Sequence, residues 1–175
     1  MGWDSLLHTY IAALCGSQPK PGERSRFSGS FPALIHCQWS ITSGADPSYN
    51  CIAWSVDETN IWYDSVGGTC NHAAGYCCID YDSEFGNNDH TLTTAEMDTF
   101  YSKKKGYTGS GSGASDAQVM YYSGFHAARK KNCSCGKGQW IMYESKCGNA
   151  ERIEHIYDQL DNSTLGYGSR TRYYK

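Results

Sequence analysis

Apolar and polar positions in the N-terminal third of the chain predict two helices separated by a polar connector. Residues 1–15 are mildly apolar with charged interruptions, which is typical of a short amphipathic helix. Residues 16–32 contain repeated Gly, Pro and Ser and predict an irregular connector. Apolar and polar residues alternate at 34–43, which predicts a strand or an extended segment that leads to the apolar run at 51–56. We expect that run to be a buried helix that ends near 57–60.

Residues that commonly start helices precede this apolar run. Asp46 or Ser48 can cap a helix, and Pro47 fits a first-turn position. The thiol of Cys51 should therefore lie in the first turn of a short buried helix.

A further helix is predicted at 93–105. Thr93 followed by Glu96 forms a capping-box pattern, and Gly106 is suited to ending the helix. The preceding segment, 61–92, is rich in Gly, Asn, Asp and Cys and has poor periodicity, so we expect a long loop there.

The pattern of residues in the C-terminal part of the chain predicts mainly strands. Residues 108–115 resemble a flexible surface loop. The segments after it predict strands at 118–122, 125–131 and 139–144, a turn at Gly136-Lys137-Gly138, a helix at 150–160 and a closing strand at 166–174. Two helices followed by an antiparallel sheet constitute an α+β arrangement.

Size and charge restrict the classes of protein to consider. The chain has 175 residues, enough for one domain, and its net charge of −3 comes from 15 basic and 18 acidic residues. The charges are mixed, and the short runs 103–105 and 129–131 read as solvated surface, so a nucleic-acid-binding protein is not indicated. No apolar segment approaches membrane-spanning length. Residues 1–15 lack a basic leader and do not resemble a signal peptide.

Nine cysteines are many for a protein of a reducing cytosol. An odd number means that four disulfides would leave one thiol free, and Cys51 is the natural candidate, although other thiols could be free. The alternative is a zinc site, with ligands from Cys70, Cys77 and Cys78 near His72, or from Cys133-x-Cys135. Neither spacing matches common zinc motifs, so disulfides are favoured and no metal or cofactor is expected.

Cys51 and His126 are the residues best suited to nucleophilic catalysis. A helix N-terminus favours a thiolate, and His126 is flanked by small and apolar residues on a predicted strand, where it could act as the base. The plainer alternatives are a packed or disulfide-bonded Cys51 and a structural His126.

A third polar group should orient the histidine. Folding the hairpin that follows His126 brings either Glu144 or Ser145 opposite it, and alternation along a strand allows only one of them to face the ring. Asn50 or the backbone N–H of Cys51 could stabilise an oxyanion. His155 is a weaker candidate for the base, because the predicted late helix would use it in packing or capping.

Several short blocks, taken in order, resemble an uncharacterised bacterial domain family over about residues 32–175. They are Asn50-Cys51-Ile52-Ala53-Trp54-Ser55, Ile61-Trp62-Tyr63, Gly106-Tyr107, Phe125-His126-Ala127-Ala128-Arg129, Ser145-Lys146-Cys147-Gly148 and Ile153-Glu154-His155. The layout is also similar to the compact NlpC-type branch of the papain-like superfamily. It departs from the NlpC pattern at Asn50, where Asp is usual, and in its extra cysteines at 70–78 and 133–135.

The resemblance implies a single papain-like hydrolase domain over 1–175, with 1–31 as N-terminal helix and connector. The implied fold is a nucleophile helix packed on a small antiparallel sheet. The implied activity is cleavage of an amide bond, with peptidoglycan peptides as substrate, Cys51 and His126 as catalytic residues, and Glu144 or Ser145 as the third.

A small single domain that is rich in cysteine suggests a secreted antibacterial effector. We expect it to be delivered to the periplasm without a cleavable signal peptide and to be opposed by an immunity protein. The alternatives are a disulfide-stapled module that binds peptides or glycans and a zinc-stabilised interaction protein.

Overall fold

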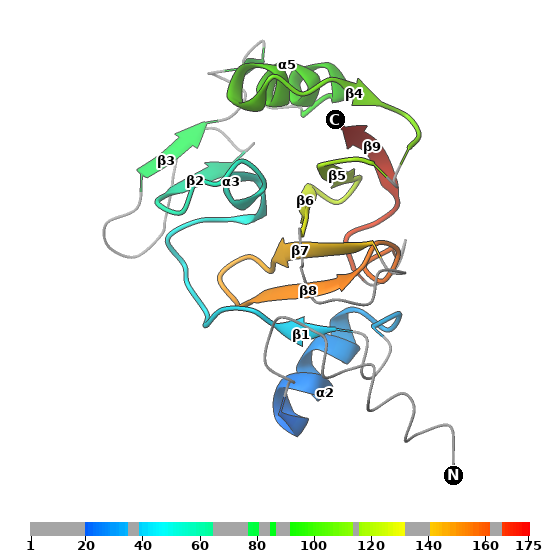
Figure 1. Cartoon of the computed structure of the whole chain (residues 1–175). Helices are drawn as coiled ribbons and strands as arrows, with labels where there is room; N and C mark the ends of the chain where they lie inside the picture. The colour runs from blue at the N-terminus through cyan, green and yellow to red at the C-terminus, as the bar shows by residue number, and fades with distance from the viewer. Residues whose placement is uncertain are drawn as a thin grey trace.

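The computed structural model describes residues 20–34, 39–64, 77–80, 85–86, 92–113, 116–131, 141–161 and 166–175. A seven-stranded antiparallel sheet lies at its centre (Figure 1). In spatial order the strands are β1 (Ser40–Ile41), β8 (Arg152–Ile156), β7 (Met142–Lys146), β6 (His126–Lys130), β5 (Val119–Tyr122), β9 (Arg170–Tyr174) and β4 (Gly109–Ser110). A separate parallel pair consists of β2 (Ile61–Asp64) and β3 (Cys77–Asp80).

Three helices within the described residues flank the large sheet. Figure 1 shows α2 (Pro21–Ser30) beside β1 at one end and α5 (Thr94–Lys105) beside β4 and β9 at the other. The short helix α3 (Cys51–Ser55) contacts β6 and β7 in the middle of the sheet.

The two faces of the sheet bury separate apolar clusters. The first cluster includes Ile52 and Trp54 from α3, Phe100 from α5, and Tyr121 and Ala127 from the sheet. The second includes the next residue of each strand, Tyr122 and Ala128, together with side chains of α2 and Trp39. Because strand side chains alternate between faces, β5 and β6 are buried on both sides, as a central strand pair must be.

The predicted helix at 93–105 is confirmed. Thr93 caps α5, accepting a hydrogen bond from the Glu96 backbone N–H at 3.3 Å, while the Glu96 carboxylate accepts one from the Thr93 N–H at 2.7 Å. Gly106 ends the helix at φ 69°, in the left-handed region that glycine adopts readily. The strands predicted at 118–122, 125–131 and 166–174 are also present, as β5, β6 and β9.

Other predicted elements are wrong. Residues 21–30 of the expected irregular connector form α2, and β2 and β3 lie within the expected long loop. The predicted loop 108–115 contains β4. The strand predicted at 139–144 is present, as β7 with the bounds Met142–Lys146. The predicted helix at 150–160 is instead β8, in which Ile153 pairs with Ser145 and His155 with Tyr143.

The papain-like fold is also wrong, because the sheet is too large and the helices too few for that architecture. The described part of the chain is mostly a seven-stranded antiparallel sheet, and the nucleophile helix has only five residues. The segment predicted as a helix at 150–160 contributes the strand β8, and the helix predicted at 1–15 lies outside the described residues.

Several sequence-based expectations fall outside the described residues. These are the turn at 136–138, Cys15, Cys37, Cys70, Cys133 and Cys135, and His8, His36, His72 and His90. Within the described ranges, no helix has the length and apolar character needed to cross a membrane.

Candidate functional site

Cys51 is the first residue of α3, and Asn50 is its cap. The Asn50 side-chain oxygen accepts a hydrogen bond from the Ala53 N–H at 3.1 Å, and its amide nitrogen donates to the Tyr63 carbonyl of β2. The predicted caps lie too early: Asp46 closes a local turn with the Ser48 N–H at 2.9 Å. The helix ends at Ser55, sooner than predicted, and Asp57 follows it at φ 67°.

The Cys51 thiol is buried against the start of β6. It donates a hydrogen bond to the Phe125 carbonyl at 3.7 Å, and the Ala127 N–H points at the sulfur from the same strand. Burial outweighs these contacts and raises the pKa of Cys51 to about 11. The resting thiol is therefore neutral at pH 7, in contrast to the thiolate expected from the sequence.

His126 is the first residue of β6 and is fully buried. Its ring stacks face to face on Tyr167, with centroids 3.4 Å apart and planes 1° from parallel. Its Nε2 lies 3.0 Å from the Ser145 hydroxyl of β7. The paired residues Ala128 and Ser145 are on one face of the sheet, so His126, two residues before Ala128, projects to the same face.

A string of hydrogen bonds fixes which nitrogen of His126 carries the proton. His155 Nδ1 lies 2.8 Å from the Ile156 carbonyl, which can only accept, so His155 is protonated there and its Nε2 is an acceptor. The Ser145 hydroxyl lies 2.8 Å from that Nε2 and must donate its single proton to it. Ser145 therefore accepts from His126 Nε2–H.

The other nitrogen of His126, Nδ1, then carries a free lone pair. Among the described residues it has no hydrogen-bond partner, although it is buried. Burial lowers the pKa of His126 well below its usual value, and the nearby His155 lowers it further. Burial also lowers the pKa of His155 to about 4. Both rings are neutral at pH 7. The Nδ1 atom of His126 is therefore a buried acceptor to which no described group donates a proton.

Cys51 and the first residue of β6, His126, lie at the same end of that strand, but their side chains are on different faces of the sheet. Cys51 belongs to the apolar cluster on the α3 side, whereas the His126 ring contacts Tyr122 and Tyr167 on the other side. No described hydrogen bond joins the thiol to the ring. The acceptor of the thiol proton is nevertheless the carbonyl directly before His126.

Phe125 is the short connection between the two groups. Its φ is 55°, an uncommon left-handed value for a residue with a side chain. The thiol therefore contacts the carbonyl of the residue directly before His126, and β7 ends at Lys146 beside the start of β6.

Two of the predicted site residues have other partners. Glu144 projects from the opposite face of β7 to Ser145 and forms an ion pair with Lys131 at 3.0 Å. Of the two candidates for the third group, Ser145 is thus the one that contacts His126. The Asn50 amide is occupied by its cap and by Tyr63, which leaves the backbone N–H of Cys51 as the remaining oxyanion candidate.

Cys51 and Cys147 are both unpaired among the described cysteines, so Cys51 is not the single free thiol that cysteine parity suggested. Cys147 hydrogen-bonds Tyr167, and burial raises the pKa of its thiol to about 12. In the parts of the chain that the structure describes, no three His, Cys, Asp or Glu side chains gather as metal ligands.

A family described as a domain of unknown function (DUF7689) matches residues 40–175. The chain belongs to this family. The DUF7689 match begins at the first residue of β1 and contains the whole seven-stranded sheet, with Cys51, His126, Ser145 and His155. No curated protein and no solved structure matches the chain.

Sequence reasoning missed two parts of the site. His155 was assigned to a helix, although in β8 the alternation of Arg152 and Glu154 with Ile153 and His155 has the period of a strand. Tyr167 is included in the strand predicted at 166–174 but lies before the start of β9, and only the tertiary fold brings it over His126.

Proposed function

We propose that the protein is a cysteine hydrolase that cleaves amide bonds, with Cys51 as nucleophile and His126 as general base. The observation that carries this proposal is the lone pair on His126 Nδ1. It is set by the fixed direction of the His155–Ser145–His126 string, and it belongs to the residue directly after the carbonyl that holds the Cys51 thiol. A base oriented by a second polar group, with a nucleophile beside it, is the arrangement that acyl transfer needs.

Both groups start neutral, so the reaction would proceed by general-base catalysis. His126 Nδ1 takes the thiol proton while the sulfur attacks the amide carbon, and the backbone N–H of Cys51 is the candidate donor to the developing oxyanion. The C–N bond then breaks, and the proton passes from His126 to the leaving amine. Water, deprotonated by His126, attacks the thioester, and the released thiolate recovers the proton.

The resting thiol donates to Phe125 rather than to His126. Substrate binding would have to turn the thiol from the Phe125 carbonyl towards His126, the next residue along the chain. Contacts of this kind are often loose without substrate and tighten in the reactive complex.

We propose that the substrate is the peptide of bacterial peptidoglycan. We also propose that the protein acts as a secreted antibacterial effector. The support is the similarity of the layout of Cys51 and His126 along the chain, though not of the fold, to NlpC-type hydrolases. This resemblance supports amide-bond hydrolysis more directly than it supports peptidoglycan as the substrate.

The test is digestion of purified sacculi, with released fragments measured by mass spectrometry. Cys51→Ala should abolish release, and His126→Gln should reduce it by about 10²–10⁴-fold, the usual contribution of a general base. Cys147→Ala is the matched control, because it removes the other unpaired thiol and should leave the rate within about twofold of the original protein.

Cleavage by Cys51→Ala at the original rate would overturn the proposal. Loss of activity in Cys147→Ala but not in Cys51→Ala would move the nucleophile to the second thiol.

A further inference from the structure

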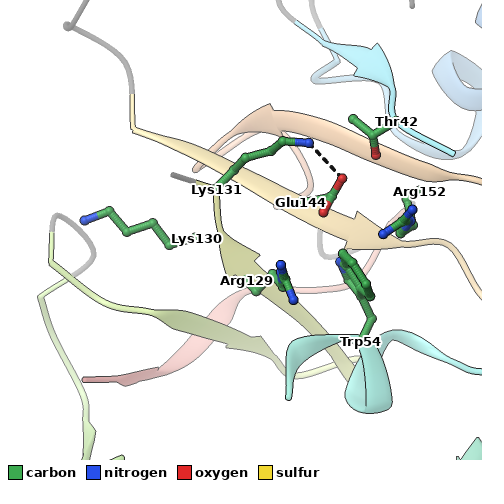
Figure 2. A pocket seen from close by; sticks show the side chains of 7 residues that line it. All are labelled: Thr42, Trp54, Arg129, Lys130, Lys131, Glu144 and Arg152. Atoms are coloured by element: carbon green, nitrogen blue, oxygen red, sulfur yellow. Dashed lines mark hydrogen bonds and ion pairs between the residues drawn. The ribbon is translucent and has the colours of Figure 1, made fainter. Parts of the chain in front are cut away.

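A pocket of about 390 Å³ lies between α3 and the adjoining face of the sheet (Figure 2). It lies on the opposite face to the His126 ring. The lining side chains that matter below are Thr42, Trp54, Arg129, Lys131, Glu144 and Arg152. Figure 2 also labels Lys130, which projects away from the other six. The basic run at 129–131 is thus half-buried in part of a pocket, rather than the solvated surface expected from the sequence.

Three polar atoms in this pocket are buried and have no hydrogen-bond partner in the described structure. They are the indole nitrogen Nε1 of Trp54, the guanidinium nitrogen Nε of Arg152 and the hydroxyl oxygen of Thr42. Trp54 is only 8% exposed, so water outside the protein does not readily satisfy its N–H. Buried polar groups are nearly always hydrogen-bonded, and three unsatisfied groups in one pocket indicate a missing partner.

The three groups are held in place by their neighbours. The Thr42 backbone N–H donates to the Arg152 carbonyl at 2.9 Å, which continues the β1–β8 pairing and fixes these two side chains beside each other. The guanidinium groups of Arg129 and Arg152 lie 4.1 and 4.0 Å from the Trp54 ring centroid. Stacking of this kind orients the arginines without using their N–H groups.

The charges of the pocket leave one cation without an acidic partner. Lys131 pairs with Glu144 at 3.0 Å, and Arg129 pairs with Asp57. Within the described ranges, no carboxylate lies at ion-pair distance from the Arg152 side chain. An N–H, a guanidinium and a hydroxyl, all able to donate, surround a space with excess positive charge.

We propose that this pocket binds the oxyanion group of a ligand, a carboxylate or a phosphate, through Arg152, Trp54 Nε1 and Thr42. A guanidinium donates to either group with favourable geometry, and charge-assisted bonds are the strongest available to it. The volume exceeds that of a bare ion and suits an anionic group attached to a larger molecule. The site stands apart from the Cys51 thiol and does not depend on its reactivity.

The experiment is a titration of the ¹⁵N-labelled protein at constant ionic strength, followed by the Trp54 indole N–H signal. The chain has five tryptophans, and Trp54→Phe identifies this signal by its loss. The probes are inorganic phosphate, acetate and, as the uncharged isostere of acetate, acetamide. A saturable shift with phosphate or acetate, and none with acetamide, is expected, and whichever anion binds more tightly identifies the group.

Variants connect the shift to the pocket. Arg152→Gln should weaken binding by at least about tenfold, as expected when a charged donor is lost. Thr42→Val keeps the shape of the side chain, removes its hydroxyl and should weaken binding several-fold. Cys51→Ala should bind as the original protein does, so loss of hydrolysis and loss of anion binding are separable. Lys175→Gln removes a cation that is 42% exposed and paired with Asp116, and it should have no effect.

No saturable shift with either anion would overturn the proposal. So would equal weakening by Arg152→Gln and Lys175→Gln, which would mean that the shift reports general charge. If Arg152→Gln fails to fold, Thr42→Val decides: unchanged affinity in that variant removes the proposed site.

Discussion

Ser145 has one hydroxyl proton and stands between two buried imidazoles, His126 at 3.0 Å and His155 at 2.8 Å. The Ile156 carbonyl forces His155 to be the acceptor, so the direction of each bond is set from the far end of the string. A serine here orients His126 without placing a charge beside it. This explains how a neutral imidazole can be held with its Nδ1 lone pair free.

Replacing Ser145 should therefore affect both stability and reactivity. Ser145→Ala leaves one donor and one acceptor unsatisfied in a buried place, and we expect a loss of about 1–3 kcal/mol in the free energy of unfolding. Hydrolysis should fall as well, because the His126 ring is no longer oriented. Urea denaturation and the sacculus assay measure the two effects.

Glu144→Gln is the matched control for this variant. It changes the neighbouring residue of β7, on the opposite face, and removes the charge that pairs with Lys131. Its hydrolysis rate should stay close to that of the original protein. Equal loss of rate in both variants would indicate that β7 as a whole, rather than the hydroxyl of Ser145, supports the reaction.

The sequence allowed part of the site to be predicted at this scale. Folding the hairpin about its turn limited the partner of His126 to Glu144 or Ser145. The predicted register is wrong by two residues, because Ser145 lies opposite Ala128 rather than opposite His126. Choosing between them required the observed pairing of Ala128 with Ser145. The neutral state of Cys51 could not be predicted, since it depends on how deeply α3 is buried.

At the scale of elements, Asn50 does more than cap α3. It accepts from the Ala53 N–H and donates to the Tyr63 carbonyl, so it joins the nucleophile helix to β2. Helix α3 has only five residues and cannot be stable by its own hydrogen bonds. Its position, and with it that of the Cys51 thiol, should depend on this one side chain.

The two capped helices offer a direct comparison. Thr93→Ala removes the cap of α5 and should cost about 1 kcal/mol of the free energy of unfolding. Asn50→Ala should cost more, about 2–4 kcal/mol, because a buried carbonyl also loses its donor. Asn50→Asp keeps the acceptor for Ala53 but sets a carboxylate oxygen against the buried Tyr63 carbonyl, so it should cost at least as much as Asn50→Ala. Urea denaturation gives all three values, and an Asn50→Ala cost no greater than that of Thr93→Ala would contradict the second role.

Helices and strands could be predicted from the sequence where the residues that determine them lie close together along the chain. Helix α5 carries its start and its end in Thr93, Glu96 and Gly106, and the structure follows them. The segment at 152–156 failed because Ile153, Ile156 and Leu160 have helical spacing, while the alternation that marks a strand extends over only a few residues. Pairing with both β1 and β7 decided its conformation, and a single sequence does not display that pairing.

At the scale of the whole molecule, the large sheet separates two kinds of chemistry. The α3 face carries the thiol of Cys51 and the positively charged pocket at Arg152, whereas the opposite face carries the neutral string that ends at His126. The ends of β6 and β7 are where the two sides come together.

The buried histidines should also govern how the molecule responds to acid. The pKa of His155 is about 4 in the folded protein and about 6.5 when the chain is unfolded, so between these values the unfolded state binds more protons. Stability contributed by His155 is fully present above pH 6.5, falls as the pH drops towards 4 and is lost below it. The full contribution is about 3 kcal/mol. The pKa of His126 is lowered in the same direction, so its effect adds to that of His155.

Urea denaturation at pH 7, 6, 5 and 4 tests this expectation. The original protein should lose stability progressively across the series, with the slope steepest between pH 6 and 4. His155→Gln cannot take up a proton there, so it should be less stable at pH 7, where its packing is imperfect, yet show a shallower loss on acidification. Parallel curves for the two proteins would mean that His155 does not titrate in the folded state as its burial requires, and that acid acts elsewhere in the molecule.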